Sequence, residues 1–349
     1  MIPPELVYQV LNFTDRKYLL VPCSLVCWTW LEVSRTLYFN RLELQRKSRH
    51  LRRLEEIMRP SIRCTIPWKR IKTLSITKHS ASPLFQSEHH VQTVCRTIGL
   101  LRQHVSPDVL VINVERSQPT IHTSHIISSA FDAISYLRLQ VQEGDLNELV
   151  PFICMFPVLE TVDLSCGTAR DFTVSSPAIL PTTLRDFRLR ISRFTNGTGD
   201  TFAFWLKSNS AILAWKHLSL LDIPRTSVYA AALSPPYGYP SIETLYVSFK
   251  CLDGYRAYQS NVEDLIPCIS LAHARCLREV TFYIPDTNYY LIPILKNVGK
   301  ASRSVQHGSP LTIALITSDE VFQREPKEWL NLDQMVAENR DWVLILMNG

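Results

Sequence analysis

The stretch ISYLRLQ (residues 134–140) recurs in outline 25 residues later as LETVDLS (residues 159–165), and again 25 residues later as LRDFRLR (residues 184–190). Each stretch has an apolar residue, two further residues, a second apolar residue, one residue and a third apolar residue. The same frame begins at residues 39, 71, 109, 218, 242 and 277. Its end alternates as a short strand does, with apolar side chains on one face and polar side chains on the other. The repeated spacing therefore predicts a series of short strands.

Helical patterns are expected between these strands, at Val91–Leu101, Leu146–Phe156, Thr201–Lys207 and Asn261–His273. One strand–connection–helix unit cannot bury its own apolar face, so such units stack on one another. The period near 25 resembles that of leucine-rich repeats. The predicted fold class is α/β, with an irregular leucine-rich-repeat-like solenoid over residues 71–349. Its last frames, near Ile313/Leu315 and Ile345/Met347, are expected to form an irregular cap. A doubly wound α/β domain fits the same alternation and remains the alternative.

The first 45 residues have a different pattern, which predicts three short helices. Pro3 and Pro4 suit the start of a helix, where a missing N–H costs nothing. Asp15 is the expected N-cap of a second helix. A third helical apolar pattern runs from Leu25 to about Leu37. Such a small core usually needs a partner or a neighbouring domain to bury its remaining apolar surface.

These residues resemble the F-box motif, in the variant found in many fungal F-box proteins. The resemblance rests on IPPEL (residues 2–6), VL (residues 10–11), LL (residues 19–20) and CSLVCWTW (residues 23–30). It implies docking to the Skp-type adaptor of a cullin–RING (SCF-type) ubiquitin ligase. Carried over residue by residue, it gives as adaptor-binding side chains Pro3, Leu6, Leu19, Leu20, Val26, Cys27 and Trp30. For the leucines and valines among them, membership of the module's own core is an equally good interpretation. Pro22 departs from the family pattern and is expected to kink or split the second helix.

The repeat region resembles the leucine-rich repeats that often follow F-boxes, although it lacks their recurring Asn or Cys after the strand. In such a solenoid the residues between the buried strand positions face one side. The expected target-binding residues on that side are Tyr136, Arg138, Asp163, Arg188, Arg190, Asp222, Tyr246, Glu279 and Tyr283, with Gln140 and Asp186 beside them. Tyrosines among charges of both signs favour a protein or peptide target over bare nucleic acid. The alternative is that most of them are solvated strand residues.

Positive charge gathers in one segment, although the whole chain carries only +5. Residues 46–72 contain ten Lys or Arg against Glu55 and Glu56. We expect a domain order of an F-box-like helical module (1–45), a basic helical linker (46–70) and the repeat region (71–349). The basic run can be a solvated helix, a surface for an acidic partner or a nuclear-localisation patch.

The sequence also carries expectations about chemistry and location. Nine scattered cysteines without paired spacing are typical of reduced thiols, so cytoplasm or nucleus is expected. The start of the chain lacks the basic region of a signal peptide, and no stretch is long and apolar enough to span a bilayer, so no membrane partner is expected. Nucleophile-elbow, zinc-protease and phosphate-loop motifs are absent, so we expect an adaptor that is not an enzyme and uses no cofactor or metal. An unrecognised α/β enzyme and a non-ligase scaffolding repeat protein remain the alternatives, since catalytic groups can meet from distant positions.

Overall fold

The structure is a computed structural model of the chain. It describes residues 3–12, 17–45, 48–58, 68–77, 88–116, 124–173, 178–195, 197–210, 215–221, 228, 241–248, 276–284, 311–317, 334, 337 and 342–348. The expectations that fall outside these residues include the Asp15 N-cap, the target-binding Asp222, the neighbouring Ile223 and the helix at Asn261–His273. The described residues divide into an N-terminal unit (residues 1–140 and 155–158) and a C-terminal unit (residues 141–154 and 159–349).

The chain begins with three short helices, α1 (Pro4–Asn12), α2 (Lys17–Cys23) and α3 (Trp28–Tyr38). Pro4 opens α1 and Glu5 lies in its first turn, where a negative charge is favourable. The helices pack around a small apolar cluster of Val7, Leu11, Leu20 and Val33, flanked by the half-buried Cys23, Trp30 and Leu37. We call residues 3–40 the helical module.

The prediction that the third helix begins at Leu25 is wrong, because α3 begins at Trp28. Pro22 lies in the last turn of α2 and has no N–H to donate. After it the chain tightens, because the N–H of Leu25 donates to the carbonyl of Pro22 at 3.0 Å and that of Val26 to Cys23 at 3.2 Å. Cys27 is extended (φ −163°, ψ 175°) and precedes α3 as its N-cap residue. Val26 and Cys27 therefore lie in the connection before the helix.

The N-terminal unit continues into parallel strands. The strands are β1 (Arg41–Gln45), β2 (Thr73–Thr77), β3 (Val109–Arg116) and the first half of β4 (Tyr136–Asp145). The helices between them are α4 (Ser48–Ile57), the 3-10 turn η1 (Trp68–Arg70), α5 (Glu88–Leu101) and α7 (Ser124–Ala130). β1 pairs with β2 in parallel, so the strand that follows the helical module is part of the sheet. The N–H groups of Lys72 and Thr73 both donate to the carbonyl of Asn40 at 3.0 Å. The predicted linker therefore contains the helix that connects the first two strands.

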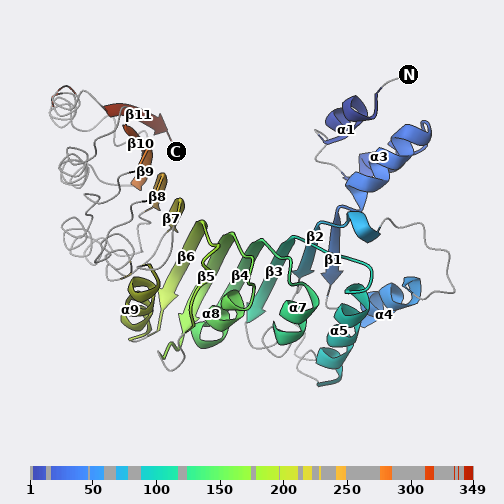
Figure 1. Ribbon diagram of the computed structural model, residues 1–349, viewed down its shortest axis with the longest axis horizontal. Helices are drawn as coiled ribbons and strands as arrows, with labels where there is room; N and C mark the ends of the chain where they lie inside the picture. Colours follow the sequence, from blue (N-terminus) through green and yellow to red (C-terminus); the bar gives the residue numbers. More distant parts are fainter. Residues whose placement is uncertain are drawn as a thin grey trace. The chain divides into compact units, whose positions relative to one another are not determined.

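The C-terminal unit has the second half of β4 and seven further strands. In chain order it contains α8 (Leu146–Cys154), β5 (Thr161–Arg170), β6 (Asp186–Phe194), α9 (Thr198–Ser210), β7 (His217–Leu221), β8 (Thr244–Ser248), β9 (Glu279–Ile284), β10 (Leu311–Thr317) and β11 (Trp342–Asn348). From β5 to β11 each strand pairs in parallel with the next along the chain. Figure 1 shows these strands side by side, with α8 and α9 on one side of β5 and β6. The described strands lack the reversal of order that characterises a doubly wound sheet.

The core of the C-terminal unit is one face of this sheet. A row of paired residues crosses the strands with at most 1% of each side chain exposed: Val162, Phe187, Leu218, Leu245, Val280 and Ile313. A second row follows two residues later in each strand: Leu164, Leu189, Leu220, Val247, Phe282 and Leu315. The opposite face is called the outward face below.

Two of the predicted strand frames are out of register. In β7 the buried residues are Leu218 and Leu220, so the frame begins at Trp215 and the predicted Leu218/Leu221/Ile223 frame is wrong. Trp215 is fully buried and stacks on Phe187, with ring centroids 5.4 Å apart. Sequence alone misplaced this frame because leucines fill successive positions of the strand.

The other displaced frame is the last one. Ile313 of β10 pairs with Leu344 of β11, so Ile345 and Met347 face outward. They are 41% and 39% exposed, whereas the sequence placed them as apolar cap positions. A shift of one residue moves every side chain of a strand to the other face, and β11 is apolar on both faces, so its pattern did not fix the register.

Candidate functional site

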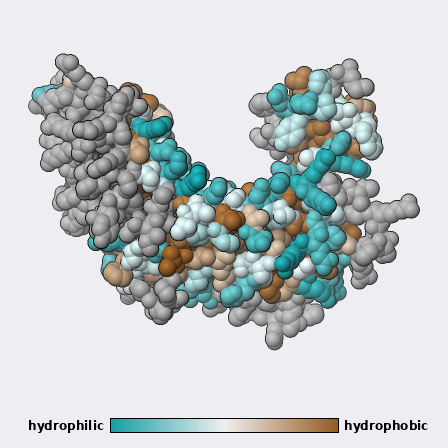
Figure 2. All heavy atoms as spheres, viewed as in Figure 1, coloured by the Kyte–Doolittle hydropathy of each residue, from teal (hydrophilic) through white to brown (hydrophobic). Residues whose placement is uncertain are grey.

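Of the side chains described in the helical module, more large apolar ones are exposed than buried. Figure 2 shows hydrophobic residues in brown at its surface, beside hydrophilic ones in teal. Those that are at least 41% exposed are Leu6, Tyr8, Val10, Val21, Leu25, Val26, Trp28 and Tyr38. Contiguous exposed apolar surface is a feature of interaction sites, so these side chains are candidates for contact with a partner.

The predicted adaptor-binding residues divide into two groups. Pro3, Leu6, Val26 and Cys27 are exposed and available to a partner. Leu20 is only 4% exposed and belongs to the module's own core, and the half-buried Trp30 packs against that core. Leu19 lies in α2, and its side chain is outside the described part.

The most exposed side chains of the module were not all in the predicted set. Leu25 is 82% exposed and Trp28 is 75% exposed, at the connection that leads from α2 into α3. On α1, Leu6 and Val10 form an exposed pair four residues apart, next to the buried pair Val7 and Leu11. The sequence signal for Leu6 and Val10 was that α1 carries two apolar i, i+4 pairs. So small a core needs only one of them, so the other pair is left on the surface.

The outward face of the C-terminal unit carries most of the predicted target-binding residues. Arg188, Arg190 and Glu279 are exposed there, and Asp163, Tyr246 and Tyr283 are partly exposed. The strand register brings them into rows, since Asp163 pairs with Arg188 and Ser219 pairs with Tyr246.

Two predicted residues lie in the N-terminal unit, on β4. The Arg138 guanidinium donates to the Tyr136 hydroxyl at 3.0 Å and lies 5.8 Å from the centre of its ring. This contact holds the two side chains together on the outward side of the strand, between the buried Leu137 and Leu139.

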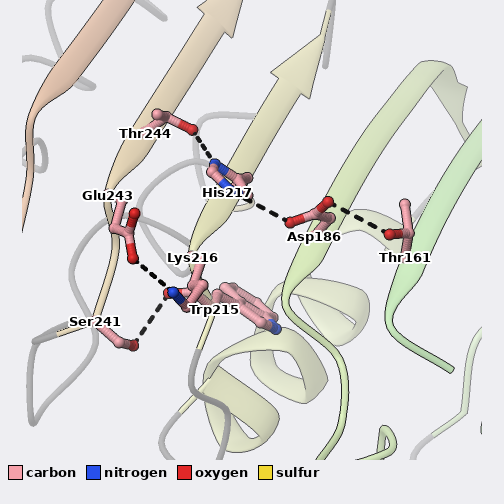
Figure 3. A network of polar contacts seen from close by, with 8 residues as sticks. All are labelled: Thr161, Asp186, Trp215, Lys216, His217, Ser241, Glu243 and Thr244. Carbon is pink, nitrogen blue, oxygen red and sulfur yellow. Dashed lines mark hydrogen bonds and ion pairs between the residues drawn. The ribbon is translucent and has the colours of Figure 1, made fainter. Parts of the chain in front are cut away.

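A polar ladder crosses four strands of the outward face (Figure 3). The Thr161 hydroxyl donates to Asp186 at 3.3 Å, and the imidazole of His217 lies 3.7 Å from the same carboxylate. The other ring nitrogen of His217 is 2.5 Å from the Thr244 hydroxyl. One residue earlier, Lys216 forms a 2.7 Å ion pair with Glu243. The hydrogen bond and charge of Lys216 lower the pKa of Glu243.

The basic segment has a buried face and a charged face. Leu51 and Met58 are buried, while Arg52 and Arg53 are exposed. On the packed side Glu55 accepts two hydrogen bonds from Arg96, at 3.0 and 2.7 Å, and so raises the pKa of that guanidinium. This ion pair joins α4 to α5, which is a structural role.

Two buried cysteines of the described part are poorly suited to nucleophilic chemistry. Burial raises the pKa of both the Cys154 and the Cys166 thiol to about 12, so both remain protonated near neutral pH. In the described ranges, no three side chains of His, Cys, Asp or Glu are grouped so that they could hold a metal ion. Within the same ranges no helix has the length and apolar character that crossing a membrane requires.

Comparison with protein families matches residues 1–42 to the F-box domain. The chain therefore has an F-box domain at its N-terminal end, followed by a parallel β-sheet. F-box domains generally mediate binding to the Skp-type adaptor of SCF ubiquitin ligases. A search of curated proteins found no match to this chain.

Proposed function

We propose that the chain is a substrate-recruiting adaptor of an SCF-type ubiquitin ligase. The F-box domain binds the Skp-type adaptor, and the outward face of the parallel sheet binds a protein target. The sheet belongs to a leucine-rich-repeat-like solenoid, which is supported by the strands following chain order and by the helices between them. In this proposal the chain has no catalytic activity of its own.

The exposed apolar surface of the helical module is the observation that carries this proposal. Leu25, Val26 and Trp28 lie on adjoining turns and are each more than 60% exposed. Keeping such side chains in water is unfavourable at roughly 25 cal/mol per Å² of apolar surface. A partner that covers them therefore gains this free energy on binding.

The experiment compares two exposed aromatic side chains in the full chain. Trp28→Ala should weaken binding to purified Skp-type adaptor by about thirtyfold, as truncating an interface anchor does. The control is Phe204→Ala, because Phe204 is 62% exposed on α9 outside the helical module. It should leave adaptor affinity unchanged. Equal affinities for Trp28→Ala and the native chain would remove the connection before α3 from the interface.

A truncation tests the alternative role as a scaffolding protein. A chain that starts at Asn40 keeps the carbonyl that binds Lys72 and Thr73, and keeps β1 intact. It should fold its sheet and lose adaptor binding completely. If the untruncated chain fails to bind the adaptor, the helices only cover the end of the sheet and the ligase function is wrong.

A further inference from the structure

Within the described part of the chain, the strand β11 has one paired edge and one open edge. It pairs in parallel with β10 over its whole length, from Leu311 opposite Trp342 to Thr317 opposite Asn348. In the order of the described strands it stands at the end, after β10 (Figure 1). The backbone N–H and C=O groups along an open edge are available to pair with a further strand.

The register shows which backbone groups of β11 face the open edge. The N–H of Thr312 in β10 donates to the carbonyl of Arg278 at 2.9 Å, so Thr312 is directed toward β9. Successive residues of a strand direct their backbone groups to alternate sides, so Ile313 bonds to the two neighbours of its β11 partner, Leu344. The backbone groups of Leu344 itself, and of Leu346, are therefore directed to the open edge.

The residues of β11 lack the features that usually protect an edge strand. Its sequence, WVLILMN (residues 342–348), contains no charged residue and no proline. Such residues on an edge oppose pairing with another chain. The strand β1, at the other end of the strand order, carries Arg41 and Glu43 among its five residues. Of the two terminal strands, β11 is therefore the one suited to accept a further strand.

Apolar surface is left to be covered on both faces of β11. On the outward face Val343, Ile345 and Met347 are 43%, 41% and 39% exposed. On the core face Leu344 is partly exposed, although the residues of the same row from β5 to β10 are at most 1% exposed. A strand added beside β11 contacts apolar side chains on both faces, which favours its binding.

The sequence of β11 is suited to antiparallel pairing with itself. With a twofold axis at Ile345, Val343 of one copy lies opposite Met347 of the other, and Leu344 lies opposite Leu346. All these residues are apolar, so no charge lies opposite a like charge. The open-edge N–H and C=O groups of Leu344 and Leu346 then bond to each other. Ile345 lies opposite its counterpart in a pair without hydrogen bonds, where side chains are closest.

We propose that the chain forms a twofold dimer, in which β11 pairs antiparallel with β11 of a second copy around Ile345. An interface of this kind uses the same surface on both copies, so the pairing closes at two chains. A seven-residue strand pair is smaller than a standard interface of ~1,200–2,000 Å², so the dimer forms as protein concentration rises. The pairing uses no residue of the F-box domain and does not depend on the proposed ligase function.

Sedimentation velocity of the full chain over a range of concentrations measures the association. The native chain should pass from monomer to dimer as its concentration rises. Ile345→Lys and Ile345→Glu each place like charges opposite each other, and each alone should weaken dimerisation at least tenfold. An equimolar mixture of the two variants should recover the dimer, because opposite charges then lie opposite each other. The matched control is Ile179→Lys, at an isoleucine that is 56% exposed outside the strands, which should dimerise as the native chain does.

Cysteine variants test the register of the pairing. Oxidised Ile345→Cys should yield a disulfide-linked dimer, because Cβ atoms directly across an antiparallel pair are only ~4.5–5.5 Å apart. Met347→Cys should not, because the two Met347 positions are separated by four residues along the strands, about 14 Å. The native chain, with its exposed Cys27 and Cys276, gives the background of crosslinking.

Four results would each overturn the proposal. They are a native chain that stays monomeric at every concentration, an equal loss of dimer in Ile179→Lys, no recovery in the mixture of charged variants, and equal crosslinking at positions 345 and 347. Adaptor affinity is measured on the same variants and should not change, so loss of the dimer and loss of the ligase function are distinguishable.

Discussion

The helical module leaves many large apolar side chains exposed, whereas the C-terminal sheet buries rows of them on one face. Among the side chains that the structure describes, the module buries Val7, Leu11, Leu20 and Val33 and exposes eight large apolar or tyrosine side chains. The sheet aligns its apolar residues in two rows that are at most 2% exposed from β5 to β10. The difference indicates that the sheet stabilises itself by stacking strands, whereas the module leaves surface that a partner protein can cover.

The largest expected effect separates the two tryptophans of the module. Trp30 packs against its small core, so Trp30→Ala should destabilise the module by about 2–4 kcal/mol, slightly less than the loss of a fully buried aromatic. Amide hydrogen exchange of residues 4–38 in the full chain should accelerate, and adaptor affinity should fall with it. Trp28→Ala should leave this exchange unchanged. Retained protection with lost affinity in Trp30→Ala would instead assign Trp30 to the docking surface.

The second prediction concerns Gly167, where the backbones of β4 and β5 approach each other closely. A Cβ at Gly167 would lie 2.6 Å from the backbone oxygen of Gln142. Gly167→Ala should therefore cost about 1–3 kcal/mol, because the strands must move apart. Gly99, in α5, has open space around it. Gly99→Ala should be neutral or stabilise by up to ~1 kcal/mol, as alanine does in a helix. Urea unfolding of both variants measures the contrast, and equal midpoints would show that the strand adjusts without cost.

The sequence predicted the strands well where polar and apolar residues alternate. In β6 the order Asp186, Phe187, Arg188, Leu189, Arg190 fixes both the strand and its buried face, and the structure agrees. In β11 both faces are apolar, so pairing with β10 decides which residues face outward. The exposure of Ile345 and Met347 could not be predicted for this reason.

The candidate site on the helical module was predicted in part. The F-box resemblance pointed to this module, and Leu6 and Val26 are exposed there, while their role in binding stays a prediction. It did not separate side chains that hold the module together from those available to a partner. Distinguishing the two groups requires knowing where α3 begins. Because of the turn that follows Pro22, α3 begins at Trp28, later than the sequence pattern predicted.

The third prediction tests whether surface charge contributes to the sheet. The pKa of Glu243 is lowered by the hydrogen bond and charge of Lys216, so the folded state favours the carboxylate. The resulting stabilisation is present above the ordinary glutamate pKa of about 4.3 and is lost as the pH falls through the lowered value. Glu243→Gln should unfold at lower urea than the native chain at neutral pH, and the difference should vanish in strong acid. The control is Glu160→Gln, a change at an exposed position, which should unfold at the same urea concentration as the native chain at neutral pH.

The smallest expected effect concerns the polar interior of the helical module. Ser34 is 1% exposed, and its hydroxyl has no hydrogen-bond partner among the described residues. Burying an unsatisfied hydroxyl is unfavourable, and alanine favours a helix more than serine does. Ser34→Ala should therefore raise the stability of the module by less than ~1 kcal/mol, seen as slower amide exchange in α3.

The control for Ser34 lies two residues along the same helix. The Thr36 hydroxyl donates to the carbonyl of Glu32 at 2.9 Å and accepts from Arg70 at 2.6 Å. Thr36→Ala removes a satisfied group and should give no gain. If Ser34→Ala lost stability instead, the Ser34 hydroxyl would have a favourable role inside the module. The contrast with the sheet would then rest on the exposed apolar surface of the module alone.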